Sequence, residues 1–129
     1  MSRLERLREW GQTMVEFALL LPVLLLIVFG IFEFGRAFYA YSTVANAARE
    51  AARFGIVDPT NTSGIQDAAI SHATALGLTS SDVVIQCPDG ACTVGNRISV
   101  TVNYTFSAVV PLIPSFALSG AATMRIESQ

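Results

Sequence analysis

The N-terminal third of the chain carries one long apolar run between charged flanks. From Phe17 to Phe32, sixteen residues follow one another without a charge, somewhat fewer than the roughly 20 that span the hydrocarbon core of a bilayer. Aromatic residues extend this run, because Trp10 precedes it and Tyr39 follows it. The helix between these two aromatics would be about 44 Å long, which matches a bilayer with its headgroups. The pattern predicts a single transmembrane helix over residues 12–36.

Beyond the run, apolar positions keep a helical spacing up to about residue 55. They fall near one stripe, consisting of Phe34, Phe38, Tyr41, Ala45, Ala48, Ala52 and Gly55. The other side of the helix carries Asn46, Arg49, Glu50 and Arg53. Such a small-residue stripe suits close packing against a sheet or another helix. We expect its distal part to be buried within the same domain.

Within the membrane helix, a few residues are expected to shape packing and depth. Pro22 can be tolerated there as a local kink. Gly30 and Gly35 are small enough to let a neighbouring helix approach closely. Glu33 and Arg36 stand three positions apart and can pair at the outer boundary, a contact worth roughly a few tenths of a kcal/mol.

A turn-rich stretch, DPTNTSG, ends the long helix, and a short helix over residues 64–77 is expected after it. Ser63 and Gln66 have the spacing of a capping box, and Gly77 is the expected C-terminal cap. The buried face would consist of Ile65, Ala69, Ala73 and Leu76. His72, the one histidine, lies near the edge of that face, and we interpret it as a surface or core residue.

The remaining sequence has the pattern of strands near residues 83–87, 97–106 and 121–127. The middle segment, RISVTVNYTF, alternates apolar and polar residues, which is typical of a half-buried antiparallel strand. The connection 109–116, within VVPLIPSF, is apolar enough to lie on the membrane surface or on a partner, but burial under the sheet is the simpler expectation. The whole pattern predicts an α+β fold, in which a long helix packs on a small antiparallel sheet with a short second helix.

Charge and composition indicate how the chain is oriented in a membrane and argue against a nucleic-acid partner. Only 14% of the residues are charged, 52% are hydrophobic and the mean hydropathy is +0.51, which favours a membrane-attached chain. Three of the eight basic residues, Arg3, Arg6 and Arg8, precede the apolar run and favour a cytoplasmic N-terminus with residues 37–129 outside. The chain after residue 11 has five arginines against eight acids, so no nucleic-acid partner is expected.

A cleavable secretory signal is the simplest competing interpretation. A basic stretch before an apolar run also begins such signals, and Ala40, Tyr41 and Ser42 loosely resemble their cleavage site. However, the run is longer than usual, and Glu33, Arg36 and bulky aromatics occupy a stretch that would be small and neutral in a signal. We expect the segment to be retained.

Cys87 and Cys92 flank a Pro-Asp-Gly turn. In an exported body two close cysteines favour a disulfide, which in the chain-entropy model adds about 2 kcal/mol for so small a loop. Free thiols are the alternative, since a metal site would need four ligands and a redox motif would need C-x-x-C. The sequence has no nucleophile-elbow, zinc-protease or phosphate-loop motif, so we expect no enzymatic activity, cofactor or metal.

One carboxylate, Glu16, stands at the entrance of the apolar run. An acid at membrane depth suggests a functional site, although a position in the cytoplasmic headgroup layer would also accommodate it. Gly11 lies five residues earlier, after a short charged leader, and Phe17 follows the acid. This G-x-x-x-x-E-F arrangement resembles the type IV prepilin signature.

The resemblance implies cleavage of residues 1–11 by a prepilin peptidase at the Gly11–Gln12 bond. The mature chain would keep 118 residues, and Glu16, with Phe17 beside it, would be near its new end. The family implies that the acid pairs with the α-amino group of a neighbouring subunit. Such a pairing is physically coherent, because a buried charge needs a compensating one.

Further motifs make the resemblance more specific. MVEFALLLPVLLLIVFG, EFGR at 33–36 and NAAREAAR at 46–53 are similar to the TadE-like family of the tight-adherence (Flp, type IVb-like) pilus system, over residues 10–55. Major Flp pilins are much shorter, so the resemblance implies a minor pilin or pseudopilin.

The resemblance also implies partners and a location. The partners would be the prepilin peptidase, sibling major and minor pilins, an inner-membrane assembly platform with its ATPase, and membrane lipid. The location would be the bacterial inner membrane as a single-pass protein, or the pilus itself. The alternative is a signal-anchored extracytoplasmic binding domain with an uncleaved N-terminus, whose sheet or 109–116 loop would capture a ligand.

Overall fold

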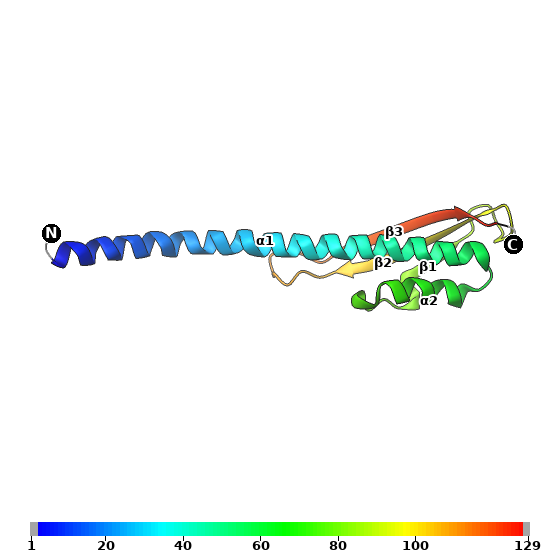
Figure 1. Ribbon diagram of the computed structural model, residues 1–129, viewed down its shortest axis with the longest axis horizontal. Coiled ribbons are helices and arrows are strands. Elements are labelled where there is room, and N and C mark those ends of the chain that lie inside the picture. The colour runs from blue at the N-terminus through cyan, green and yellow to red at the C-terminus, as the bar shows by residue number, and fades with distance from the viewer. Residues whose placement is uncertain (1–2, 128–129) are drawn as a thin grey trace. The chain divides into compact units, whose positions relative to one another are not determined.

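The computed structural model describes residues 3–127 and divides into two compact units, Met1–Gly35 and Arg36–Gln129. Helix α1, Arg3–Val57, contributes its first half to one unit and its second half to the other (Figure 1). The predicted long N-terminal helix is therefore confirmed.

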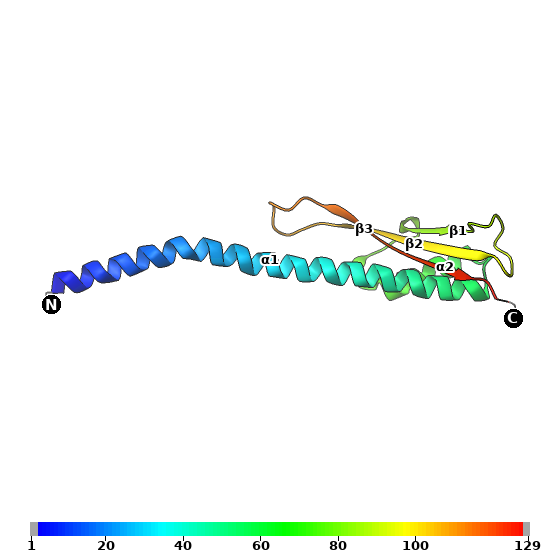
Figure 2. The ribbon, with the colours of Figure 1, turned by 90° about the horizontal axis from the view of Figure 1, so that it is seen from above.

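The first unit is a single helix. Large hydrophobic side chains are exposed along it, and its most apolar 18-residue window has a mean hydropathy of 2.7 with none of it buried. Among the described residues, α1 is the one helix long and apolar enough to cross a membrane. Pro22 lies inside α1, and Figure 2 shows a bend in the first half of the helix, as expected where proline removes a backbone hydrogen bond.

The second unit adds a short helix and a three-stranded sheet to α1. Helix α2 is followed by two 3₁₀ turns, η1 and η2, and the strands follow in chain order. The bounds are α2 Thr62–His72, η1 Thr74–Leu76, η2 Ser80–Asp82, β1 Val83–Gln86, β2 Arg97–Phe106 and β3 Phe116–Arg125. The sheet order is β1-β2-β3 with both pairs antiparallel, which confirms the α+β class.

The sheet lies along the second half of α1 (Figures 1 and 2). Residues of β2 alternate as predicted, with Ile98, Val100, Val102 and Phe106 buried. Across from them, α1 presents its buried face, Ala40, Val44, Ala47, Ala48, Ala51 and Ala52. Ile65 and Ala69 of α2 complete the same core cluster. Burial of this apolar surface is what stabilises the fold.

Small residues set how closely helix and sheet approach. A Cβ added to Gly120 of β3 would lie 2.7 Å from the backbone of Ala45. A Cβ on Gly55 would lie 2.7 Å from the Cδ1 atom of Ile98. The helix backbone thus rests almost directly on the strand at Gly120, an approach that larger side chains would prevent.

The predicted stripe of α1 is correct in its distal part and wrong in its proximal part. Ala48, Ala52 and Gly55 are buried as expected. The side chains of Phe34, Phe38 and Tyr41 are instead exposed. Because the close contact with β3 admits only small side chains, the buried face runs through the alanines, and the aromatic side chains are excluded from it.

The short helix starts earlier and ends earlier than predicted. Its cap is Asn61, whose side-chain oxygen accepts a hydrogen bond from the Gly64 backbone N–H at 2.9 Å, so the predicted Ser63–Gln66 capping box is wrong. The side chain of Gln66 instead donates to the Ser80 carbonyl at 3.1 Å. Gly77 does act as a C-cap in the left-handed region, at φ 64°, but it caps η1 because α2 has already ended.

Two expectations for the third strand and its connection are wrong. β3 begins at Phe116, five residues before the predicted 121, and all ten of its residues pair with β2. The connection 109–116 is not buried under the sheet: Leu112 is 79% exposed, and Val109, Ile113 and Phe116 are also exposed. The inner face of the sheet is already covered by α1, which leaves no room there for the connection.

The end of the sheet that carries the Pro-Asp-Gly turn is closed by two cross-links. Cys87 and Cys92 form the predicted disulfide, with their Cα atoms 5.4 Å apart. Asp89, inside this loop, accepts hydrogen bonds from the Arg97 backbone N–H at 2.8 Å, from Nε at 3.1 Å and from Nη2 at 2.8 Å. The loop is thereby fastened to the first residue of β2.

The Arg97 guanidinium, chiefly through its hydrogen bonds, lowers the pKa of Asp89 from 3.8 to about 2. A carboxyl group whose pKa is lower in the folded state stabilises the fold when ionised. Its contribution is fully present above about pH 4 and disappears as the pH falls through the folded-state pKa.

We expect Gly120→Ala to destabilise the second unit by roughly 1–3 kcal/mol, because its new methyl group must displace the α1 backbone. Thermal unfolding of the full-length protein in detergent measures this change. Gly35→Ala is the matched control, since a Cβ there meets no atom within 4 Å. Equal melting temperatures for both variants would contradict the close packing at Gly120.

We expect Asp89→Asn to lower stability near neutral pH and to lose this effect in acid. The urea midpoints of the wild type and the variant should differ above about pH 4, draw together as the pH falls through 2 and converge below it, because the wild-type carboxylate is protonated only below its folded-state pKa. Asp67→Asn, an exposed aspartate of α2, is the control for a general change in charge. A difference that persists unchanged below about pH 2 would contradict the ion pair as its cause.

Candidate processing and assembly site

The predicted processing bond lies on the surface of α1. Gly11 and Gln12 are both exposed and helical. A Cβ added to Gly11 would meet no atom within 4 Å. A larger side chain would therefore fit at this position without a clash inside the chain. The glycine is therefore available for recognition by another protein.

Glu16 lies one turn after Gln12 on the same side of the helix. Its Oε1 accepts a hydrogen bond from Nε2 of Gln12 at 3.3 Å, and both residues are exposed. The structure thus brings together the residue that would become the new N-terminus and the acid expected to act in assembly. The pairing between subunits stays a prediction.

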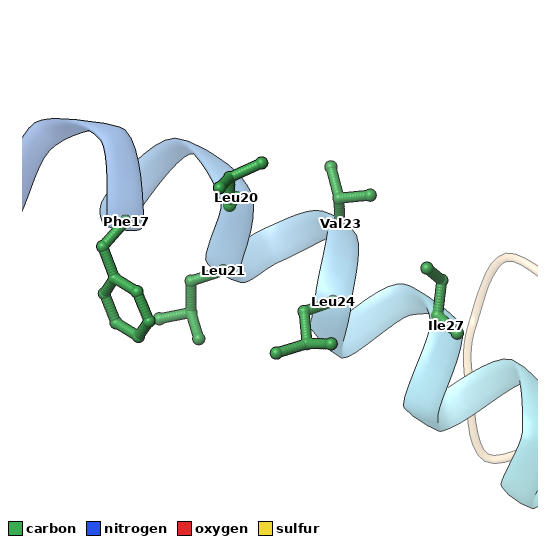
Figure 3. A pocket seen from close by; sticks show the side chains of 6 residues that line it. All are labelled: Phe17, Leu20, Leu21, Val23, Leu24 and Ile27. Atoms are coloured by element: carbon green, nitrogen blue, oxygen red, sulfur yellow. The ribbon is translucent and has the colours of Figure 1, made fainter.

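Around and beyond the acid, the helix surface is apolar and grooved. Trp10, Thr13, Met14 and Phe17 line a hollow of 520 Å³. A second hollow of 360 Å³ is lined by Phe17, Leu20, Leu21, Val23, Leu24 and Ile27 (Figure 3). In Figure 3 the side chains of Phe17, Leu21 and Leu24 point to one side and those of Leu20 and Val23 to the other.

Such hollows on a single helix are grooves between rows of side chains, open to their surroundings. Rows at a spacing of three and four residues are what the ridges of a second helix pack into. Gly30 and Gly35, the predicted packing residues, are exposed with open space around their Cα atoms. The first half of α1 therefore offers an apolar surface that either lipid chains or neighbouring helices can cover.

Two charged residues follow the apolar run, and they differ in their surroundings. Glu33 is only 3% exposed, whereas Arg36 is partly buried. The Arg36 Cζ atom lies 5.2 Å from the ring centroid of Phe106, and that ring packs on Phe116 at 5.2 Å between centroids. An arginine over an aromatic ring is a favourable cation–π contact.

The contact of Arg36 with Phe106 was not predicted from the sequence. The two residues are seventy positions apart, and the strand pattern shows which face Phe106 occupies but not which part of α1 it meets. The two phenylalanines at the ends of the β2–β3 connection could have indicated their own cross-strand pair, because aromatic pairs opposite each other stabilise a sheet, but they gave no signal for Arg36.

The described residues contain no cluster of three or more His, Cys, Asp or Glu side chains that could hold a metal ion. His72 is exposed, and its Nδ1 atom lies 3.2 Å from the carbonyl oxygen of Ala68. Cys87 and Cys92 are joined in the disulfide. None of these residues lies near Glu16 in the chain, and they form no common site.

Comparison with known proteins supports the interpretation of the N-terminal segment. The family model described as TadE-like protein matches residues 11–53. The match begins at the predicted processing glycine and ends with the NAAREAAR motif. Comparison with curated proteins found no match, and comparison with solved structures found none either.

The matched third of the chain comprises the apolar run of α1 and the whole alanine face that packs on the sheet. Through residues 11–53 the chain is similar to the TadE-like protein family.

Proposed function

We propose that the chain is a minor pilin or pseudopilin of the tight-adherence pilus, cut after Gly11 and assembled through the first half of α1. The observation that carries this proposal is the coincidence of three features in one segment: the TadE-like match, an apolar helix exposed on all sides, and a single acid one turn beyond the cleavage position.

The apolar surface needs cover that this chain does not supply. Large hydrophobic residues from Met14 to Phe32 are exposed all around the helix, far more than soluble monomers normally present to water. Lipid covers such a surface before assembly. In a fibre the helices of sibling pilins replace the lipid, with Gly30 and Gly35 at positions of close approach.

Cleavage changes the electrostatic surroundings of Glu16. In the uncut chain α1 begins at Arg3, so Glu16 lies more than three turns inside the helix. After cleavage the helix begins at Gln12, with an α-ammonium group and the positive end of the helix dipole within about one turn of the acid. A carboxylate in lipid costs several kcal/mol without such compensation. An ammonium group of an adjacent subunit compensates it in the same way and fixes the register of the two helices.

The partners that we propose are those that the similarity to the TadE-like family implies. A prepilin peptidase removes residues 1–11 at the cytoplasmic side, and sibling pilins pack on α1. The assembly platform and its ATPase then act on the membrane-embedded subunit. The arginine-rich leader favours a cytoplasmic N-terminus, which places residues 37–129 outside the inner membrane as a structural domain.

We expect Gly11→Leu to block processing while leaving the fold unchanged, because the added side chain meets open space in this chain. Intact mass of the protein purified from its native membrane is the measurement. The wild type should begin at Gln12 and lack the mass of residues 1–11, whereas the variant should keep them. Gly35→Leu, a second exposed helix glycine in open space, is the matched control and should be processed normally.

An intact leader on the wild-type protein, in cells with an active prepilin peptidase, would overturn the proposal. The signal-anchored binding domain would then be the better interpretation. Normal processing of the Gly11→Leu variant would show that the glycine is not the recognition element.

We expect Glu16→Ala to be processed normally but to assemble poorly. Loss of the carboxylate leaves the neighbouring ammonium group uncompensated at membrane depth, so the fraction of subunit found in sheared pili or crosslinked to other pilins should fall by about tenfold or more. Glu50→Ala is the control, because Glu50 forms only an exposed pair with Arg53 at 3.7 Å. Equal assembly of the two variants would remove Glu16 from the mechanism.

A further inference from the structure

The connection between β2 and β3 exposes an apolar tip. Its backbone turns where the Ile113 N–H donates to the Val110 carbonyl at 3.1 Å, with Pro111 at the position that favours such turns. Leu112 follows the proline and is 79% exposed. From Ile98 to Met124 the sequence contains no charged residue and no histidine. The tip therefore has no charge with which to recognise a charged partner.

The position of this tip along the second unit follows from two contacts. Gly120 of β3 meets Ala45 of α1. From Gly120 back to Phe116 the strand covers about 13 Å, and from Ala45 back to Arg36 the helix covers about 13.5 Å. These lengths agree, and the contact of Arg36 with Phe106, the partner of Phe116, confirms the alignment. The strands thus end beside Arg36, the first residue of the second unit.

The connection continues past these strand ends (Figure 2). The apolar run ends at Phe32, four residues before Arg36 on the same helix. Next to it on α1, the side chains of Phe38, Tyr39 and Tyr41 are exposed. Exposed aromatic residues at the end of an apolar helix are typical of the membrane interface. The uncharged tip and these aromatic residues lie at the same end of the second unit.

We propose that the tip of the β2–β3 connection, residues 109–113, inserts into the outer headgroup and acyl boundary of the membrane as a second lipid contact of the unassembled subunit. This inference rests on the proposed function, which places the helix before Arg36 in lipid. Lipid is the occupant that fits, because the tip is apolar, uncharged and attached to a unit whose first residue follows the membrane run. Apolar side chains at such a boundary reach about 5–10 Å below the headgroups.

The contact also has a consequence for the exported domain. A helix alone leaves a domain free to rotate about the helix axis, whereas two separate lipid contacts fix which face of the domain looks toward the membrane. The β2–β3 connection would thereby hold the disulfide-closed end of the sheet, at the opposite ends of the strands, away from the bilayer.

Single-cysteine variants of the full-length protein in lipid vesicles test this proposal. Both native cysteines are disulfide-bonded, so Leu112→Cys can be labelled selectively, without reductant, with a polarity-sensitive nitrobenzoxadiazole dye. Val94→Cys, 63% exposed near the disulfide, is the matched control, and Ile27→Cys reports whether α1 is in lipid. The vesicles contain phosphatidylcholine and phosphatidylglycerol, with spin-labelled lipid as quencher.

We expect a blue-shifted emission at Leu112→Cys, with quenching strongest by spin labels near the headgroups, and a water-like emission at Val94→Cys. A lipid signal at Ile27 with a water-like signal at Leu112 would overturn this inference and leave the proposed function intact. Water-like signals at both Ile27 and Leu112 would overturn the proposed function as well. Shielding of Leu112 that appears only at high protein-to-lipid ratios would identify a second copy of the chain as the occupant, and would also overturn the inference.

Discussion

The close contact between an alanine face of α1 and the sheet is the constraint on which the rest of the structure depends. One helix has to be apolar on every side in its first half and apolar on one narrow face in its second half. Alanine and glycine at the face let Gly120 approach the backbone of Ala45. Because this contact fixes the sheet along α1, it also fixes where Arg36 meets Phe106 and where the β2–β3 connection ends.

The sequence predicts those elements whose pattern is carried by their own residues. β2 was predicted with its observed bounds, because apolar and polar residues alternate along all of it. β3 was not, since its first half, FALSGA, is rich in small residues with weak strand preference, and its pairing depends on β2 and on α1. The N-terminal cap of α2 was predicted at the wrong residue for a local reason. Asn61 and Ser63 are both residue types that suit a cap, and the backbone conformation of the turn determines which of them caps the helix.

The same distinction applies to the site. Gly11 and Glu16 remain predictions from the resemblance to the prepilin signature, which could be made because the signature and the apolar run lie in one continuous segment, and the family match covers that segment. The disulfide was also predicted from spacing. The pairs of Asp89 with Arg97 and of Arg36 with Phe106 join separate segments. Such contacts depend on the register of strands against each other and against the helix, which no local pattern contains.

The orientation of the strands along α1 determines how the domain responds to force. A pull on the first half of α1 is transmitted along the helix backbone to the alanine face, because α1 is one continuous helix from Arg3 to Val57. The strands lie along the same axis, so the load shears the whole interface at once and does not open it residue by residue from one end. Under the proposed function, a subunit drawn from the bilayer by its helix would therefore keep its second unit folded.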